Sequence, residues 1–314
     1  MKSFLVLLLF IFSVSALAKF STYEEFALST FRQYDNTLTI HVIPAPDRLE
    51  WTKPRWLLWS LLKNDYWFPK TTSSLGHVTG EINCNLNGEK VHNFIGQTSP
   101  DLDGFRTYVH MGYGFSILNS PNQYKDLPLL TTVGLLDDYK KATERYARLV
   151  NKDHMGFLSF KISEEACQNI NDFMTEYQTK TKETKLAGNR YGFGADPFKF
   201  EGAGCAPMVQ SLLLKGGIDD YARFMEQTVY VSDKLLGDPP NGKKVGVLDL
   251  LFSDEDISVE KKEARVFRFP DPQGLYDRIM GIVHSKFVDD YPVLEKKNLN
   301  DKNVWYVLLD TTQQ

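Results

Sequence analysis

The chain has 314 residues, of which 42% are hydrophobic and 24% charged, and its formal net charge is −4 at pH 7. These ordinary values exclude an intrinsically disordered or collagen-like chain and predict a folded protein with a large core. No block of Lys and Arg residues provides the basic surface that nucleic-acid binding requires, so we expect no nucleic-acid partner.

The first eighteen residues are expected to be a cleaved secretory signal. A short positive start precedes the uninterrupted apolar run from Phe4 to Phe12, and Ala16-Leu17-Ala18 has the small residues at which signal peptidases cut. This apolar run is too short for a permanent membrane span. The alternative is an uncleaved N-terminal anchor. A cleaved signal implies a periplasmic or secreted protein.

Apolar periodicity, β-branched runs and turn signals predict alternating strands and helices in the first part of the chain. The tryptophans of the aromatic-rich segment 51–67 are expected to pack in the core, and the alternative is that they form a platform for a ligand. In order, we expect a helix over 21–34, a strand over 37–43, a helix within 51–67, a hairpin over 75–98, a helix over 133–151, a strand over 156–162 and a helix that begins after Ser163.

The second part of the chain continues this pattern after a glycine-rich loop over 181–204. Pro207 near the start and Gly216-Gly217 after the end delimit a helix that begins at Cys205 and ends at Lys215. Beyond it we expect a helix over 219–236, a strand over 244–252, a strand over 264–269, a helix over 272–287 and a strand over 303–310. This mixture predicts an α+β fold.

The chain has three cysteines, Cys84, Cys167 and Cys205, and export would place them where thiols tend to pair. An odd number leaves at least one thiol unpaired, and such a thiol is a candidate reactive group. If Cys205 is the free thiol, Cys84 and Cys167 either form the only internal disulfide or remain as two buried thiols.

Cys205 is the candidate nucleophile because it lies at the predicted start of a helix. The backbone N–H groups and the dipole at that end favour a thiolate, which is the attacking form of cysteine. The same N–H groups, with the Gly202-Ala203-Gly204 segment before them, are suited to bind the oxyanion of a tetrahedral intermediate. The alternative is a small buried residue that packs a helix end.

His77 is the candidate general base, since a thiolate nucleophile needs a base within hydrogen-bond reach. It begins a predicted strand, and strand alternation places His77, Thr79 and Glu81 on one polar face. The alternative is a surface histidine without a chemical role.

The order of these motifs resembles that of the circularly permuted papain-like superfamily. The matching segments are Gly76-His77-Val78-Thr79, the Asn87-Gly88 hairpin, the strand and helix from Phe157 to Tyr177, Arg190 to Gly194, and Gly204 to Leu213. This group includes permuted NlpC-type hydrolases and is similar to lecithin retinol acyltransferase-like proteins.

The resemblance implies a thiol hydrolase or acyltransferase that acts on amide or ester bonds, often in cell-wall peptides or lipids, and uses no cofactor. It assigns Cys205 as the nucleophile and His77 as the base, and it places Tyr191 where the family often has an aromatic residue. Ala206-Pro207 departs from the polar residue that many relatives have after the cysteine.

The family also places a polar residue on the strand after the histidine, and His92, Asn93 and Gln97 are the candidates. With a two-residue turn at Asn87-Gly88, residue 83 faces residue 92, and both share the face of His77. This register favours His92, although a one-residue bulge would transfer the role to a neighbour.

The resemblance covers residues 71–217 and predicts a permuted papain-like core, an antiparallel sheet packed on helices. It is flanked by the signal at 1–18, an aromatic-rich N-terminal extension at 19–70 and a C-terminal α/β extension at 218–314. We expect a secreted or periplasmic cysteine hydrolase whose substrate is a peptide, peptidoglycan or lipid. The alternative is a catalytically silent envelope protein that binds a peptide, glycan or acyl ligand.

Overall fold

The computed structural model describes residues 22–67, 75–98, 109–118, 132–133, 135–150, 155–183, 190–192, 195–284, 291–299 and 304–312. The expected signal at 1–18 lies outside the described residues.

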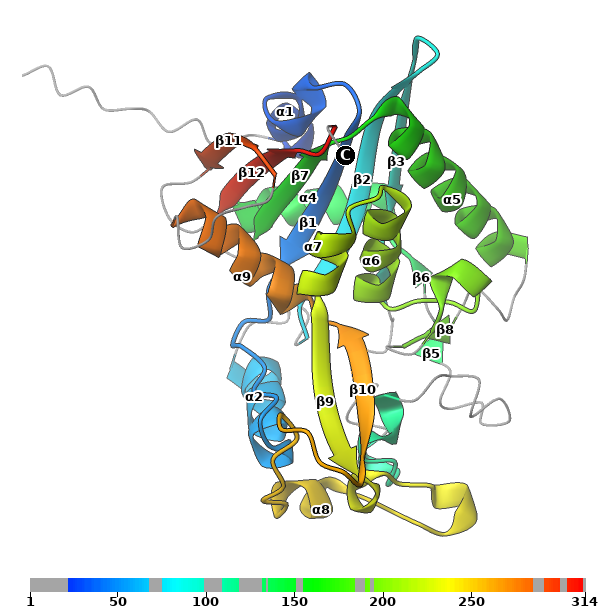
Figure 1. Ribbon diagram of the computed structural model, residues 1–314, viewed down its shortest axis with the longest axis vertical. Coiled ribbons are helices and arrows are strands. Elements are labelled where there is room, and N and C mark those ends of the chain that lie inside the picture. The colour runs from blue at the N-terminus through cyan, green and yellow to red at the C-terminus, as the bar shows by residue number, and fades with distance from the viewer. Residues whose placement is uncertain are drawn as a thin grey trace, which may run out of the picture.

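A six-stranded mixed sheet is the centre of the fold, with the strand order β11-β12-β7-β1-β2-β3 (Figure 1). Neighbouring strands are antiparallel except for β12 and β7, which are parallel. The bounds are Thr37–Ile43 for β1, His77–Leu86 for β2, Glu89–Ile95 for β3, Gly156–Lys161 for β7, Val293–Asn298 for β11 and Trp305–Asp310 for β12.

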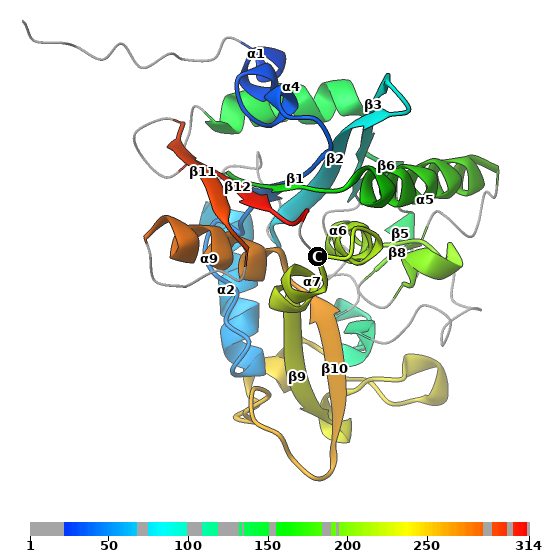
Figure 2. The same ribbon diagram turned by 45° about the horizontal axis from the view of Figure 1, so that its top comes forward.

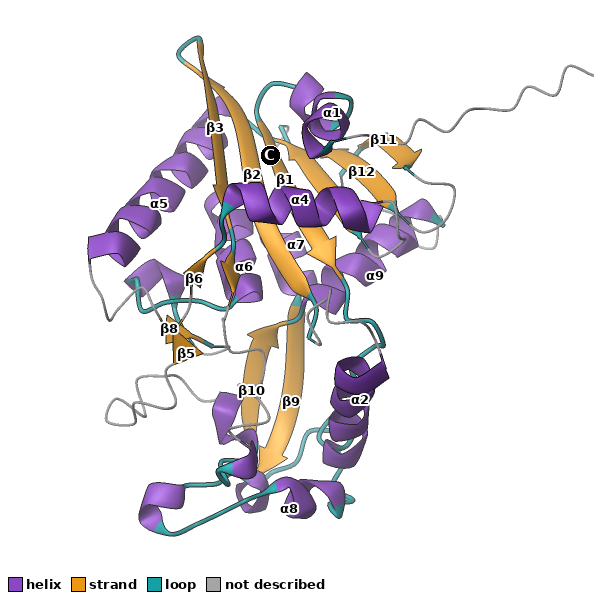
Figure 3. Ribbon diagram, turned by 180° about the vertical axis from the view of Figure 1, so that it is seen from behind, coloured by secondary structure: helices purple, strands orange, loops and turns teal. Residues whose placement is uncertain are grey.

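Helices cover both faces of this sheet, which gives three layers (Figure 2). One face packs against α5, α6, α7 and α9, and the opposite face against α1 and α4 (Figure 3). The bounds are Tyr23–Leu28 for α1, Tyr139–Val150 for α4, Glu164–Glu183 for α5, Cys205–Lys215 for α6, Asp219–Phe224 for α7 and Pro272–Val283 for α9. Because the central strands are buried on both faces, β1 is buried along its whole length.

Helix α6 lies directly against β2 because the strand has a glycine at the contact. A Cβ atom placed on Gly80 would be 2.1 Å from the Leu212 Cδ1 atom, so the helix occupies space that any other residue would fill. Both Leu212 and its neighbours on α6 are buried in the main core. The missing side chain therefore sets how closely α6 approaches the sheet.

A smaller body extends below the sheet and is built on the antiparallel pair of β9, Glu226–Ser232, and β10, Ala264–Pro270 (Figure 1). Helix α2, Pro54–Trp67, packs with α8, Val247–Leu251, beside this strand pair. The core of the smaller body contains apolar residues from α2, the strand pair and α8, among them Leu57, Val229 and Leu250. Among the described residues, two small two-stranded sheets complete the strands: β4 at Gln97–Thr98 pairs with β6 at Leu135–Leu136, and β5 at Thr132–Val133 pairs with β8 at Arg190–Tyr191.

The α+β prediction is confirmed, and so is the register of the β2–β3 hairpin, in which Asn83 faces His92. The sheet contains strands from all three expected regions, 19–70, 71–217 and 218–314. Strand β1 lies before residue 70, and β11 and β12 lie after residue 217. A core confined to 71–217 would lack half of these strands.

Several expected elements differ from the observed ones. The helix predicted over 133–151 begins only at Tyr139, and the segment 219–236 is a short helix followed by strand β9. The segment 244–252 was predicted as a strand but contains helix α8, and strand β11 was not predicted. On α2, Trp56 is 45% exposed and Trp59 is 57% exposed, so the expectation that these rings pack in the core is wrong.

The structure shows which cysteines pair and which one is free. Cys84 on β2 and Cys167 on α5 form a disulfide, with their Cα atoms 6.0 Å apart, and Cys205 is a buried free thiol. The disulfide joins the sheet to the helix layer on the α6 side. It also leaves Cys205 as the only titratable thiol of the chain.

Candidate functional site

Cys205 and His77 meet at one end of the sheet, although 128 residues of sequence separate them. Cys205 is the first residue of α6 and His77 the first residue of β2. The His77 ring and the Cys205 thiol are hydrogen-bond partners, and the Val78 backbone N–H also donates to the sulfur. The two residues predicted as nucleophile and base are therefore in contact.

Simple element geometry explains why these two residues coincide. Leu212 contacts β2 at Gly80, and Cys205 lies two helical turns before Leu212, about 10 Å along an α-helix. His77 lies three residues before Gly80, also about 10 Å along a strand. Since the N-terminal ends of α6 and β2 meet, the helix start and the strand start arrive at the same place.

Asp137 is the residue that orients His77. The His77 Nε2 atom donates a hydrogen bond of 2.9 Å to the Asp137 Oδ2 atom, and both side chains are largely buried. Because Nε2 faces this carboxylate, Nδ1 is the ring nitrogen left for the Cys205 thiol. The arrangement places a thiol, an imidazole ring and a carboxylate in one row.

Asp137 reaches this position through a small sheet and a glycine. Strand β6 pairs with β4, and the Asp137 backbone N–H then donates to the Gly96 carbonyl at 2.9 Å. A Cβ atom on Gly96 would be 2.2 Å from the Asp137 Oδ2 atom and 2.4 Å from the Thr79 Cγ2 atom. Only glycine leaves room at position 96 for the carboxylate that contacts His77.

Tyr191 completes the surroundings of the sulfur. Its hydroxyl donates to the Cys205 Sγ atom at 3.6 Å, within reach of a hydrogen bond to sulfur. Strand β8 carries Tyr191 and pairs with β5, so the short segment 132–137 supports both Tyr191 and Asp137. The family resemblance placed an aromatic residue at this position, but the hydrogen bond from Tyr191 to the thiol was not predicted.

Burial opposes charge on both reacting groups, but their partners prevail. For His77, the Asp137 carboxylate and the hydrogen bonds with Asp137 and Cys205 outweigh burial and raise the pKa to about 9. For Cys205, burial raises the thiol pKa, but the hydrogen bond and charge of His77, with Val78 N–H and the Tyr191 hydroxyl, lower it overall. The contact between the two groups therefore favours the thiolate of Cys205 and the imidazolium of His77.

His92 does not orient His77, contrary to the expectation from the sequence. It pairs with Asn83, which lies six residues along β2 from His77, a separation of about 20 Å. The His92 Nε2 atom instead donates to the Glu81 Oε1 atom at 2.9 Å. The register was predicted correctly, but sharing a face of the sheet does not bring two residues together when about 20 Å of strand separates them.

His92 belongs to a second polar cluster, which we call the Glu81 cluster. The buried Glu81 carboxylate accepts from Arg32 at 2.6 Å and from the Tyr23 hydroxyl at 2.7 Å, and the same hydroxyl lies 2.5 Å from His41 Nε2. Burial raises the pKa of Glu81, but His92, His41 and Arg32 outweigh it and lower that pKa to about 2. These partners therefore keep the buried carboxylate ionised, and the Tyr23 hydroxyl ties α1 to the sheet.

The other two candidates for the third residue also lie elsewhere. The Asn93 amide donates to the Asn171 side chain on α5 at 3.2 Å. The Gln97 side chain is fully buried and accepts from the Tyr177 hydroxyl at 2.8 Å. Both side chains link β3 and β4 to α5 rather than to His77.

Sequence reasoning did not identify Asp137 as a site residue, because Asp137 lies just before a strongly predicted helix, α4. Asp138 caps α4 by accepting from the Lys141 backbone N–H at 2.8 Å, so an adjacent pair of aspartates resembles a helix start. The signal that could have found Asp137 is Leu135-Leu136, a short apolar pair followed by a carboxylate outside the helical periodicity. The pairing of this segment with β4 depends on contacts distant in sequence.

Among the described residues, no group of three or more His, Cys, Asp or Glu side chains is arranged to hold a metal ion. Within the same ranges, none of the helices has both the length and the apolar character that crossing a membrane requires. No family model, curated protein or solved structure matches the chain.

We predict that the thiol of Cys205 keeps its reactivity with iodoacetamide to a lower pH than a free thiol does. A free thiol has a pKa of about 8.5 and loses reactivity below it, whereas the contact with His77 lowers the pKa of Cys205. His77→Ala removes the main partner, so its rate should fall as the pH drops below about 8.5. Carboxymethylation followed by mass spectrometry gives both profiles, and coincident profiles would contradict the ion pair.

We predict that Gly96→Ala displaces Asp137 and lowers the pKa of His77. Loss of a well-placed carboxylate is expected to change that pKa by about one unit, which corresponds to about 1.4 kcal/mol. NMR titration of the His77 ring measures the change. Gly246→Ala is the matched control, because a Cβ atom there has only ordinary contacts beyond 3.7 Å, the nearest at 3.8 Å. An unchanged His77 pKa in Gly96→Ala would contradict the role of Gly96.

Proposed function

We propose that the protein is a cysteine hydrolase of the permuted papain-like type, with Cys205 as nucleophile, His77 as acid and base, and Asp137 as the residue that orients His77. The observation that carries the proposal is the row of three buried side chains, Cys205, His77 and Asp137, in which His77 and Asp137 are 2.9 Å apart. A helix packed on a sheet needs no such row for stability. A buried thiolate and imidazolium are costly unless they are paired, as they are here.

In the first half of the reaction, the Cys205 thiolate attacks the carbonyl carbon of an ester or amide, and a C–S bond forms. The carbonyl electron pair moves to oxygen. When the intermediate collapses, the bond to the leaving group breaks and the His77 imidazolium donates its proton to the departing alkoxide or amine. The product of this half is a thioester on Cys205 and a neutral His77.

In the second half, neutral His77 takes a proton from water, and the resulting oxygen nucleophile attacks the thioester carbonyl. The C–S bond breaks, the acid is released, and the thiolate and imidazolium are restored. An alcohol or amine in place of water would give acyl transfer. Asp137 accepts the Nε2–H throughout and stabilises the ring whenever it is charged.

The first turn of α6 supplies donors for the oxyanion. The N–H groups of Cys205 and Ala206 have no acceptor one turn earlier in the helix, because they belong to its first residues. Pro207 has no N–H, so these two groups are the donors nearest the sulfur on this helix. The helix dipole adds to their effect on a negative oxygen.

We predict that the protein hydrolyses members of a panel of p-nitrophenyl acyl esters and peptide anilides. Cys205→Ala should lower kcat/KM by at least about a thousandfold, and Asp137→Asn by a smaller but large factor, because they remove the nucleophile and the orienting charge. His92→Gln is the matched control, since His92 lies in the Glu81 cluster, and it should retain wild-type turnover. Hydrolysis that survives Cys205→Ala, or a panel with no substrate that the wild type cleaves faster than Cys205→Ala, would contradict the proposal.

A further inference from the structure

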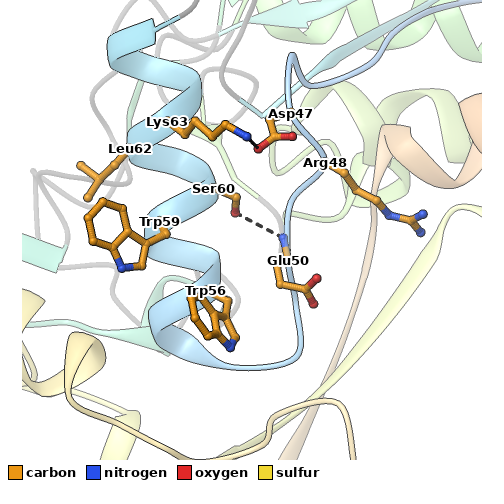
Figure 4. Close-up of a pocket in the computed structure, with 8 residues that line it drawn as sticks. All are labelled: Asp47, Arg48, Glu50, Trp56, Trp59, Ser60, Leu62 and Lys63. Atoms are coloured by element: carbon orange, nitrogen blue, oxygen red, sulfur yellow. Dashed lines mark hydrogen bonds and ion pairs between the residues drawn. The ribbon is translucent and has the colours of Figure 1, made fainter.

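A second concave site lies on the smaller body, on the surface of α2 (Figure 4). Its volume is about 630 Å³, which is within the size range of sites for small ligands. Residues of α2 and of the preceding loop line it, and none of them belongs to the row formed by Cys205, His77 and Asp137. The catalytic proposal leaves this pocket without a role.

Two exposed tryptophans give the pocket its apolar surface. Trp56 and Trp59 lie three residues apart on one face of α2, and both project from the helix (Figure 4). The helical rise separates them by about 4.5 Å along the axis, which is comparable to the length of one sugar ring. Large aromatic rings are usually buried, so two neighbouring indoles at a pocket surface indicate a ligand with flat apolar faces.

The polar residues around the tryptophans carry balanced charge. Asp47 and Glu50 oppose Arg48 and Lys63, so the lining provides no net charge to attract an ion. The Lys63 Nζ atom donates to the Asp47 Oδ2 atom at 2.6 Å. Ammonium and carboxylate groups have further donor and acceptor positions beyond one such bond. The rim can therefore both donate hydrogen bonds to a neutral polar ligand and accept them.

These features exclude several ligand classes. A cationic ligand would meet the Arg55 guanidinium, which already lies 5.0 Å from the centre of the Trp56 ring. An acyl chain would bury the charged rim without giving it hydrogen bonds, which is costly. A nucleic acid would need a net positive surface. A pyranose has flat apolar faces for the indoles and hydroxyl groups at its edge for the rim.

We propose that this pocket binds a neutral glycan chain, with pyranose rings stacked on Trp56 and Trp59 and hydroxyl groups bonded to Asp47 and Lys63. The proposal does not depend on the chemistry of Cys205. The topology nevertheless connects the two sites. The segment that contains α2 leaves the sheet at Ile43 and returns at His77, and these two residues pair with each other. A glycan bound on α2 would therefore lie beyond the end of the sheet at which His77 contacts Cys205.

The test is isothermal titration calorimetry of the full-length protein, carried out in the Cys205→Ala background so that hydrolysis cannot intervene. The probes are chitotetraose and cellotetraose, which share the flat pyranose faces and differ in the N-acetyl groups. We expect at least one of them to bind, and Trp59→Ala to weaken that binding about tenfold or more. Trp59 is mostly exposed, so this variant is expected to fold normally.

Phe252→Ala is the matched control, because Phe252 is 77% exposed but does not line the pocket. It should bind the oligosaccharide as tightly as the unmodified background. Absence of binding for both oligosaccharides, or an equal loss in Phe252→Ala, would overturn the proposal. Binding to neutral phosphatidylcholine vesicles that Trp59→Ala abolishes, without oligosaccharide binding, would also overturn it and assign the tryptophans to a membrane surface.

Discussion

The contact between the Cys205 thiol and the His77 ring is the interaction on which the account depends, and the close packing of α6 on β2 makes it. Gly80 has no side chain, so Leu212 takes its place and fixes the helix against the strand. From that contact point, equal lengths of helix and strand lead back to Cys205 and His77. Any residue with a larger side chain at position 80 would move the helix start away from the strand start.

The electrostatics of the site follow from this geometry. Removing a thiolate and an imidazolium from water is unfavourable, and burial alone would leave both groups neutral. The charged forms are favoured because each group faces the other and because Asp137 balances the imidazolium on its far side. Four residues farther along the same strand, the buried Glu81 carboxylate is likewise stabilised by its partners Arg32 and His92. One strand therefore carries two buried charged groups that depend on different partners.

The sequence could predict those parts of the structure that depend on local signals. The Asn87-Gly88 turn determines the register of β2 and β3, and the Pro207 and glycine pattern delimits α6, so both were found. Strand β9 was missed because no Gly or Pro separates it from α7, and α8 was predicted as a strand because short apolar runs fit either structure. The pairing of β12 with β7 across the region boundary at residue 217 was not predicted, because it is a long-range contact.

The site shows the same division between local and distant signals. Cys205 and His77 each begin an element, which a sequence pattern can indicate, and the structure brings them together. Asp137 depends on the pairing of β6 with β4 and on the absence of a side chain at Gly96, and neither is visible locally. His92 was favoured because it shares the face of His77, but the separation along the strand decides which residues can touch.

The central claim is that the Cys205 sulfur attacks an acyl carbon, and trapping the intermediate tests it most directly. The protein would be mixed with an activated acyl ester, quenched in acid within the first turnover and digested for mass spectrometry. The account predicts an acyl group attached as a thioester to Cys205 in the wild type, absent from Cys205→Ala and slow to form in His77→Ala. Turnover of the ester without any acyl group on Cys205, or acylation at another residue that Cys205→Ala leaves unchanged, would contradict it.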